Sequence, residues 1–166
     1  MFLRAFVVSL GIVSGAGFSQ FPEFSQQYLQ RLGGAVEELS TVVRDFDRSA
    51  ATFGMSRHKA LDEMNGSPFL QRRQADLRRT ISRYEELNDA YSALRYAGPF
   101  TRFYDLHFMF DEKILAGTWE DYQPAVPLTI EGGLFAIFGA LSGASAASVI
   151  GKLFRPWRKR KKPTAA

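Results

Sequence analysis

The stretch "GGLFAIFGALSGASAASVIG", residues Gly132 to Gly151, decides the fold because it runs for 20 residues without a charged side chain. At about 1.5 Å of helical rise per residue, it matches a hydrocarbon core about 30 Å thick. The alternative is a buried core helix, but such a helix rarely lacks every charge over this length and then meets a polybasic run. We therefore predict a transmembrane helix over residues 127–154.

A block of positive charge follows this stretch. Residues 152–162 hold seven basic and no acidic side chains, whereas the whole chain has a formal net charge of +4, so the remainder is net negative (4 − 7 = −3). A nucleic-acid-binding domain would spread Lys and Arg over a folded face, so nucleic acid is not an expected partner. We expect residues 155–166 to form a cytoplasmic tail that sets topology or contacts anionic lipid through Arg155, Arg158, Lys159, Arg160, Lys161 and Lys162.

A second apolar stretch, "MFLRAFVVSLGIVSGAGFSQF", opens the chain and has no charge between Arg4 and Glu23. Its most apolar part is short for a membrane span, and a positive start followed by an apolar middle also fits a signal peptide. No clear A-x-A cleavage site is present. We favour an uncleaved transmembrane helix or signal anchor over residues 1–21.

Small residues recur at helical spacing in both stretches. Such ladders let two helix backbones approach closely in lipid. The two spans could pack on each other through them, or two copies of the chain could form a dimer, or the small residues are merely tolerated in a span. The candidate packing residues are Gly11, Gly15, Gly139, Gly143, Ala147 and Gly151.

The charges also predict an orientation. The positive-inside rule places the basic tail in the cytoplasm, and two spans return Arg4 to the same side. We therefore expect a bacterial inner-membrane protein with both termini in the cytoplasm and residues 22–126 in the periplasm.

Residues 22–126 are predicted to be almost entirely helical. Apolar residues at alternating steps of four and three indicate one seam on a helix over residues 22–53, and a similar seam continues over residues 68–97. Gly33 and Gly34 predict a kink or a close contact in the first helix. Ser67 and Pro68 predict the start of the second, and Ser56 and Asp111 suit the caps of short helices. The first seam is Tyr28, Leu32, Ala35, Leu39, Val42, Phe46 and Ala50.

The predicted fold is therefore all-α, with two transmembrane helices flanking an antiparallel, coiled-coil-like helical hairpin and short accessory helices. In an aromatic segment, residues 100–119, the part over residues 100–110 is expected to form a short helix against the base of the hairpin, near the level of lipid headgroups, and one or two further helical turns are expected from Asp111 to Trp119. The segment "QPAVPLT" is expected to bridge to the second span in an extended form.

Two segments carry a resemblance to a known family. "FPEFSQQYLQRLGGAVEEL" after the apolar start, and "TWEDYQPAVPLTIEGG" before the second span, resemble a family of small proteobacterial membrane proteins known as a domain of unknown function. The resemblance covers residues 2–150 and implies an inner-membrane protein with two terminal spans. It implies no activity and no catalytic residue, and it does not extend over the basic tail.

The sequence predicts no catalytic site, metal site or cofactor. His58 and His107 lie in different predicted elements, with His107 expected to be half-buried, and neighbouring acids such as Glu37 and Glu38 point in different directions. The chain has no cysteine, which excludes disulfides and thiolate metal ligands. Glu131 is a possible interface carboxylate, either a proton or cation site or, as we favour, a carboxylate stabilised by the positive end of a helix dipole.

These features favour a non-enzymatic membrane protein whose helical hairpin binds a protein partner or a second copy of itself. Its expected partners are the lipid bilayer and a membrane or envelope protein. An alternative is an accessory subunit of a transporter or of an envelope-biogenesis complex. A soluble, basic nucleic-acid binder is the least favoured alternative.

Overall fold

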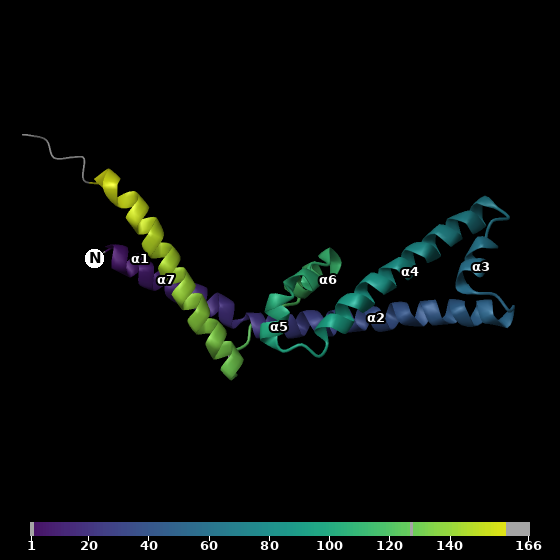
Figure 1. Cartoon of the computed structure of the whole chain (residues 1–166), viewed down its shortest axis with the longest axis horizontal. Helices are drawn as coiled ribbons and strands as arrows, with labels where there is room; N and C mark the ends of the chain where they lie inside the picture. Colours follow the sequence, from purple (N-terminus) through teal and green to yellow (C-terminus); the bar gives the residue numbers. More distant parts are fainter. Residues whose placement is uncertain (1, 127, 159–166) are drawn as a thin grey trace, which may run out of the picture. The chain divides into compact units, whose positions relative to one another are not determined.

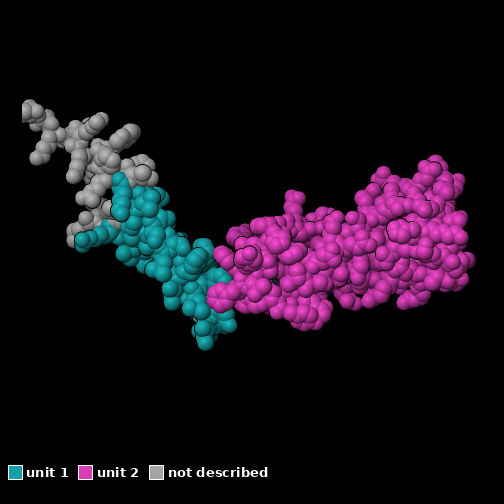
Figure 2. Space-filling model, viewed as in Figure 1, with its two compact units in different colours: residues 1–25, 123–166 teal, residues 26–122 magenta. Residues whose placement is uncertain are grey.

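The computed structural model describes residues 2–126 and 128–158 and is all-α, with no strand among these residues. The chain divides into two compact units (Figure 2): unit 1 comprises Met1–Ser25 and Gln123–Ala166, and unit 2 comprises Gln26–Tyr122. The elements, in chain order (Figure 1), are α1 (Phe2–Ser19), α2 (Phe21–Thr52), α3 (Arg57–Asp62), α4 (Pro68–Leu94), α5 (Pro99–Tyr104), η1 (Leu106–Met109), α6 (Glu112–Glu120) and α7 (Ile130–Arg158).

Unit 1 is built around α1 and α7, which pack as an antiparallel pair. Moving forward along α1 corresponds to moving backward along α7, since Gly11 lies against Ala144 and Gly15 lies against Ala140. At the end of the pair, the rings of Phe21 and Phe135 lie 5.3 Å apart, centroid to centroid.

The extended segment before α7 is fixed to the end of α1 by the side chain of Gln20. Its Nε2 donates to the carbonyl oxygen of Ala125 at 3.1 Å, and its Oε1 accepts from the Ala125 backbone N–H at 3.2 Å. Because an amide side chain has both a donor and an acceptor, one residue satisfies both backbone groups of Ala125.

In unit 2, α2 and α4 run antiparallel, and α3 fills the space between the end of α2 and the start of α4 (Figure 1). We call this end of unit 2 the tip. Its core contains one buried residue from each helix, Val43, Leu61 and Ile81. The two long helices therefore share a core with α3 there.

The opposite end of unit 2, where the chain enters at Gln26, is the base. Tyr28, Leu32 and Leu94 are almost completely buried and form the core of this end. The ring of Tyr91 packs on Gly33, where an added Cβ would lie 3.0 Å from Cε2 of the tyrosine. Gly33 therefore serves a close contact, and α2 continues through it without a break.

The predicted helix starts are confirmed. Ser56 caps α3 by accepting from the Lys59 N–H, Ser67 caps α4 by accepting from the Leu70 N–H, and Asp111 caps α6. Each oxygen satisfies a backbone donor that has no partner inside its helix. Helix α4 ends at Leu94 and not at Ala97, because residues 95–98 turn into α5.

The predicted seam of α2 is wrong in one place. The side chain of Val42 is 43% exposed, whereas that of Val43 is 3% exposed and lies in the core. Tyr28, Leu32 and Ala50 of the predicted seam are buried, and Leu29, Val36 and Val43 are buried in addition to them. Either valine would fit an apolar seam in the sequence. Which of them is buried depends on the contact of α2 with α3 and α4.

Candidate functional site

The contact between α1 and α7 is made of small residues. An added Cβ at Gly15 would lie 2.9 Å from the Ala136 carbonyl oxygen, and one at Gly139 would lie 2.5 Å from the Ser14 carbonyl oxygen. At Gly143 it would overlap Ser14 Oγ. These distances leave no room for a side chain, because each helix backbone lies directly against the other.

The structure brings most of the candidate packing residues into this single contact. Gly11 and Gly15 on α1 face α7, and Gly139 and Gly143 on α7 face α1. Ala147 is completely buried and Gly151 is half-buried. The small residues of α1 therefore pack against those of α7 in the same chain.

The outer surface of unit 1 has the opposite character, because its large apolar side chains are exposed. Two helical stretches contain a window that is long and apolar enough to cross a membrane, judged by length and composition: Arg4–Thr52, which continues from α1 through α2, and Ile130–Lys152 of α7. In the most apolar window of each, only 17% and 22% of residues are buried, unlike a core helix of a soluble protein. The exposed large residues of α1 and α7, among those that the structure describes, are Phe6, Val8, Ile12, Val13, Ile130, Leu134, Ile137, Phe138, Leu141, Val149 and Ile150.

Charge is distributed unequally between the two ends of the α1–α7 pair. Arg4, at the start of α1, and Lys152, near the end of α7, are exposed at the same end because the helices are antiparallel. Arg155 and Arg158 follow in the last turns of α7. The remaining predicted tail residues, Lys159, Arg160, Lys161 and Lys162, lie outside the described residues.

Glu131 lies at the other end of the pair, half-buried in the first turn of α7. Thr129 caps this helix, since its Oγ1 accepts from the Gly132 N–H at 3.1 Å. A carboxylate in the first turn is stabilised by the positive end of the helix dipole. The position of Glu131 therefore has a structural explanation that needs no ligand.

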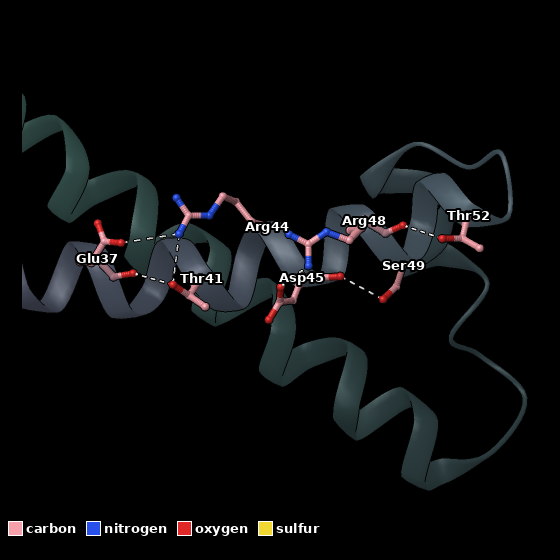
Figure 3. Close-up of polar contacts among 7 residues, drawn as sticks. All are labelled: Glu37, Thr41, Arg44, Asp45, Arg48, Ser49 and Thr52. Carbon is pink, nitrogen blue, oxygen red and sulfur yellow. Dashed lines mark hydrogen bonds and ion pairs between the residues drawn. The ribbon is translucent and has the colours of Figure 1, made fainter.

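The outer face of α2 is covered by local polar contacts (Figure 3). Arg48 bonds to Asp45 at 3.0 Å, and Arg44 lies 3.6 Å from Glu37 and 3.2 Å from Thr41 Oγ1. All of these side chains are exposed. Exposed pairs of this kind contribute little to stability, and they mark a solvated helix face.

The ion pair between Arg83 of α4 and Asp111 is the most enclosed of unit 2. Both guanidinium NH groups donate to the carboxylate, one at 2.7 Å, and Asp111 Oδ1 also accepts from the Ile114 N–H at 3.0 Å. The hydrogen bond from Arg83 holds the pKa of Asp111 below its ordinary value, and the same bond raises the pKa of Arg83. This pair fastens the start of α6 to α4.

Tyr28 lies beside this pair, in the core of the base. Its hydroxyl donates to the Phe108 carbonyl oxygen at 3.4 Å. Burial raises the pKa of Tyr28 to about 12, because the phenolate would lose its hydration. The hydroxyl therefore stays protonated at neutral pH and acts as a donor.

Polar contacts also hold α3 in place. Arg57 donates twice to Asp47, at 2.6 and 2.7 Å, and Arg78 donates to Asp62 at 2.7 Å. The hydrogen bond from Arg57 lowers the pKa of Asp47. These pairs join α3 to both long helices.

Arg102 of α5 is buried, with 7% of its surface exposed. Its Nε donates to the Leu94 carbonyl oxygen at 3.3 Å, and its NH1 donates to Gln26 Oε1 at 2.9 Å. Burial lowers the pKa of Arg102 because the charged form is desolvated. The guanidinium also lies at the negative end of the α4 dipole, which favours a cation.

Helical periodicity and capping signals in the sequence do not reveal these polar contacts. Arg83 reads as one of several arginines on the polar face of its helix, and its partner lies 28 residues away in the chain. Arg102 does carry a local signal, since it is the only charge within the apolar hexapeptide "PFTRFY". A charged group that is buried in such a run needs hydrogen-bond partners.

Two surface grooves of unit 2 contain charged residues. The larger, about 430 Å³, is lined by Leu39, Asp76, Arg79, Thr80, Arg83 and Lys113. Two of its three cations are already paired, Arg79 with Asp76 and Arg83 with Asp111. The smaller, about 180 Å³, lies beside α3 and includes His58, Arg57 and Glu85.

His107 is exposed, which corrects the expectation that it is half-buried, and its ring lies 4.1 Å from that of Phe108. His58 is also exposed. Within the described ranges, no three His, Asp or Glu side chains gather as metal ligands. Polar side chains in unit 2 are instead used in structural pairs and helix caps.

Comparison with known proteins gives one result. No curated protein and no solved structure matches the chain. A family described as "Protein of unknown function (DUF2937)" matches residues 2–160, which extends past Ile150 and includes the basic residues up to Arg160. Since this match covers nearly the whole sequence, the chain belongs to the DUF2937 family of proteins of unknown function.

Proposed function

We propose that the chain is an integral membrane protein in which α1 and α7 span the bilayer as an antiparallel pair. The observation that carries this proposal is the reversed packing of unit 1, with small residues inside and large apolar residues exposed. In water this surface would be unfavourable at about 25 cal/mol per Å² of apolar area. In lipid it is solvated, and close backbone contact supplies the packing.

The charged ends of the pair support an orientation. Arg4 and Lys152 lie at one end, with the remaining basic residues following in the sequence, whereas Glu131 lies at the other. The positive-inside rule assigns the basic end to the cytoplasm of a bacterial inner membrane. Unit 2 then lies on the periplasmic side.

Unit 2 serves in this proposal as a non-enzymatic module that binds a protein partner or a second copy of the chain. Its enclosed polar groups are engaged in structural contacts, such as Arg83 with Asp111 and Arg57 with Asp47. At the tip, Phe53 and Phe69 are each 76% exposed, and Leu70, which follows Phe69 in the sequence, is also exposed. Exposed apolar groups of this kind are typical of protein–protein contacts.

Cysteine labelling in intact cells tests the topology, because the native chain has no cysteine. Single cysteines replace Ser49 and Ser92, which are exposed on α2 and α4, and Thr164 in the tail. A membrane-impermeant thiol reagent should label the first two and should reach Thr164→Cys only after the cells are broken. Labelling of Thr164→Cys alone in intact cells would reverse the orientation, and recovery of the chain in the soluble fraction would refute the proposal.

The interaction role needs a separate experiment. Phe53→Ser with Phe69→Ser should abolish crosslinks from a photoreactive residue placed at Gln71, which is exposed near the tip. Phe6→Ser, on the outer face of α1, is the matched control and should leave these crosslinks unchanged. Absence of any crosslinked species in the native chain would contradict binding at the tip.

A further inference from the structure

Helix α5 has a reversed pattern of burial. Its one charged side chain, Arg102, is buried, whereas Tyr104 is 86% exposed and Phe100 is 51% exposed. Residues two positions apart lie on nearly opposite faces of a helix, so Phe100 and Tyr104 lie opposite Arg102. A helix that faces water normally buries its aromatic residues and exposes its charge.

A further exposed aromatic residue, Tyr96, precedes α5 in the chain. It lies just after α4 and is 83% exposed, and the guanidinium of Arg95 lies 4.2 Å from the centroid of its ring. We call Tyr96, Phe100 and Tyr104 the base patch. Tyrosine and arginine combine an apolar body with a polar end, which suits the boundary between water and hydrocarbon.

The base patch belongs to the end of unit 2 where the chain enters and leaves. Arg102 of α5 bonds to Gln26, the first residue of unit 2. Asp121, next to the last residue of the unit, bonds to Arg31 at 2.6 Å, five residues after Gln26. Helix α7 begins at Ile130, only eight residues after Tyr122. Both ends of unit 2 therefore lie near the start of α2, and the first residue of the unit lies beside α5.

We infer that the base patch rests in the headgroup region of the bilayer, an inference that depends on the proposed function. Tyrosine is enriched at this depth of membrane proteins because its ring meets acyl chains while its hydroxyl stays hydrated. Residues 95–122 carry three basic and five acidic side chains, a net charge of −2 (3 − 5 = −2). The aromatic side chains of the base patch therefore contact zwitterionic lipid, and anionic headgroups are not attracted to this part of the chain.

The tip supplies a matched comparison. Phe53 and Phe69 are aromatic and nearly as exposed as Tyr96 and Tyr104, but Phe53 follows the last residue of α2 and Phe69 lies in the first turn of α4, both at the tip. The distance along α2 from Gln26 to Thr52 is about 39 Å at the usual helical rise. The base patch should thus contact lipid, whereas the aromatic residues of the tip should not.

The test uses the full chain reconstituted in phosphatidylcholine vesicles. A fluorescent label is attached to Thr101→Cys, which is exposed on α5 and leaves the base patch intact, and in a second protein to Gln71→Cys near the tip. A third protein carries the label at Ile12→Cys on α1. Lipids with a quencher on the headgroup or on the acyl chain then report the depth of each label.

We expect headgroup quenching at Thr101→Cys at least threefold stronger than at Gln71→Cys, and unchanged in 1 M salt. Tyr96→Ser with Tyr104→Ser should lower it toward the Gln71→Cys value. Equal quenching at Thr101→Cys and Gln71→Cys, with acyl-chain quenching retained at Ile12→Cys, overturns this inference alone. Loss of the Thr101→Cys signal in salt overturns the aromatic explanation, and absence of quenching at Ile12→Cys overturns the membrane proposal itself.

Discussion

Units 1 and 2 differ in which residue types they bury and which they expose. Unit 1 buries glycine and alanine and exposes phenylalanine, leucine and isoleucine, whereas unit 2 buries Tyr28, Leu32, Leu87 and Leu94 and exposes arginine and glutamate. Because large apolar groups gain most from leaving water, the second arrangement suits an aqueous surrounding. The first suits a surrounding that is itself apolar. The two units of one chain therefore differ in the kind of surrounding that their exposed side chains suit.

The largest expected effect comes from filling the contact of unit 1. Gly139→Leu places a side chain against the Ser14 carbonyl oxygen and the Phe18 side chain, so α1 and α7 must separate. Overpacking of this kind costs about 1–3 kcal/mol, and the upper end applies where backbone is the obstacle. Gly133→Leu is the matched control, because an added Cβ there meets nothing within 4 Å.

The yield of an engineered disulfide between α1 and α7 reports whether the two helices have separated. In the native background, Gly11→Cys with Ala144→Cys should form an intramolecular bond, since the two Cβ positions are 3.5 Å apart. Gly139→Leu should lower its yield at least tenfold on a non-reducing gel, and Gly133→Leu should not. A covalent dimer in place of the intramolecular product would show that the ladders join two chains.

The second prediction concerns the polar pair that fastens α6. Arg83→Met leaves Asp111 enclosed without its bidentate partner, which should cost about 2 kcal/mol. For a unit of this size, the thermal unfolding midpoint should fall by about 10 °C. Arg79→Met, one turn away on the same helix in an exposed pair, should change the midpoint by less than about 2 °C. Equal shifts in the unfolding midpoint for the two substitutions would show that enclosure of the Arg83–Asp111 pair does not increase its contribution to stability.

The same pair predicts a pH dependence. The pKa of Asp111 is lower in the folded chain than in the unfolded chain, so its ionisation stabilises the fold above the ordinary pKa, about 3.9. That contribution is lost as the pH falls through the folded-state pKa. The difference in unfolding midpoint between the native chain and Arg83→Met should therefore narrow from pH 7 to pH 3. A difference that widens in acid would contradict the assignment.

Arg102→Leu should have a slightly smaller effect, about 1–2 kcal/mol, because Leu94 and Gln26 lose a donor while an apolar side chain fills the space. Arg95→Leu, exposed at the end of α4, is the control and should lie within about 0.5 kcal/mol of the native chain. Denaturant unfolding of the full chain in mild detergent measures both. A more stable Arg102→Leu variant would mean that burial of the guanidinium costs more than its hydrogen bonds return.

The smallest expected effect is at a helix cap. Ser67→Ala removes the acceptor for the Leu70 N–H and should cost about 1 kcal/mol, whereas Ser67→Asp should retain most of the stability. Thermal unfolding followed by circular dichroism is sufficient for this comparison. An unchanged midpoint in Ser67→Ala would show that water replaces the cap.

Local features of this fold could be predicted from the sequence, and features set by distant contacts could not. Ser56, Ser67 and Asp111 act within their own helices, so their positions identify them as caps. Val42 and Val43 are chemically identical, and only α3 and α4 decide which is buried. Partners such as Asp111 for Arg83 lie many residues away, where periodicity carries no information.

In the candidate site, the spacing of the small residues likewise does not identify the helix that they contact. Their spacing in Gly11, Gly15, Gly139 and Gly143 predicts close helix packing, but it is equally consistent with a contact between two chains. The structure pairs them within one chain. The identity of the contact depends on which helix lies nearest in space, and this follows from the antiparallel return of the chain.

Lipid exposure of the outer face of unit 1 tests the central claim most directly. A nitroxide attached to Leu141→Cys on α7 in phosphatidylcholine bilayers reports its collisions with oxygen, which concentrates in lipid, and with a water-soluble nickel chelate. We predict that oxygen relaxes this label more strongly than the chelate, and that a label at Ser92→Cys on α4 shows the reverse. Equal access of the nickel chelate to Leu141→Cys and Ser92→Cys would contradict the claim that these apolar side chains face lipid.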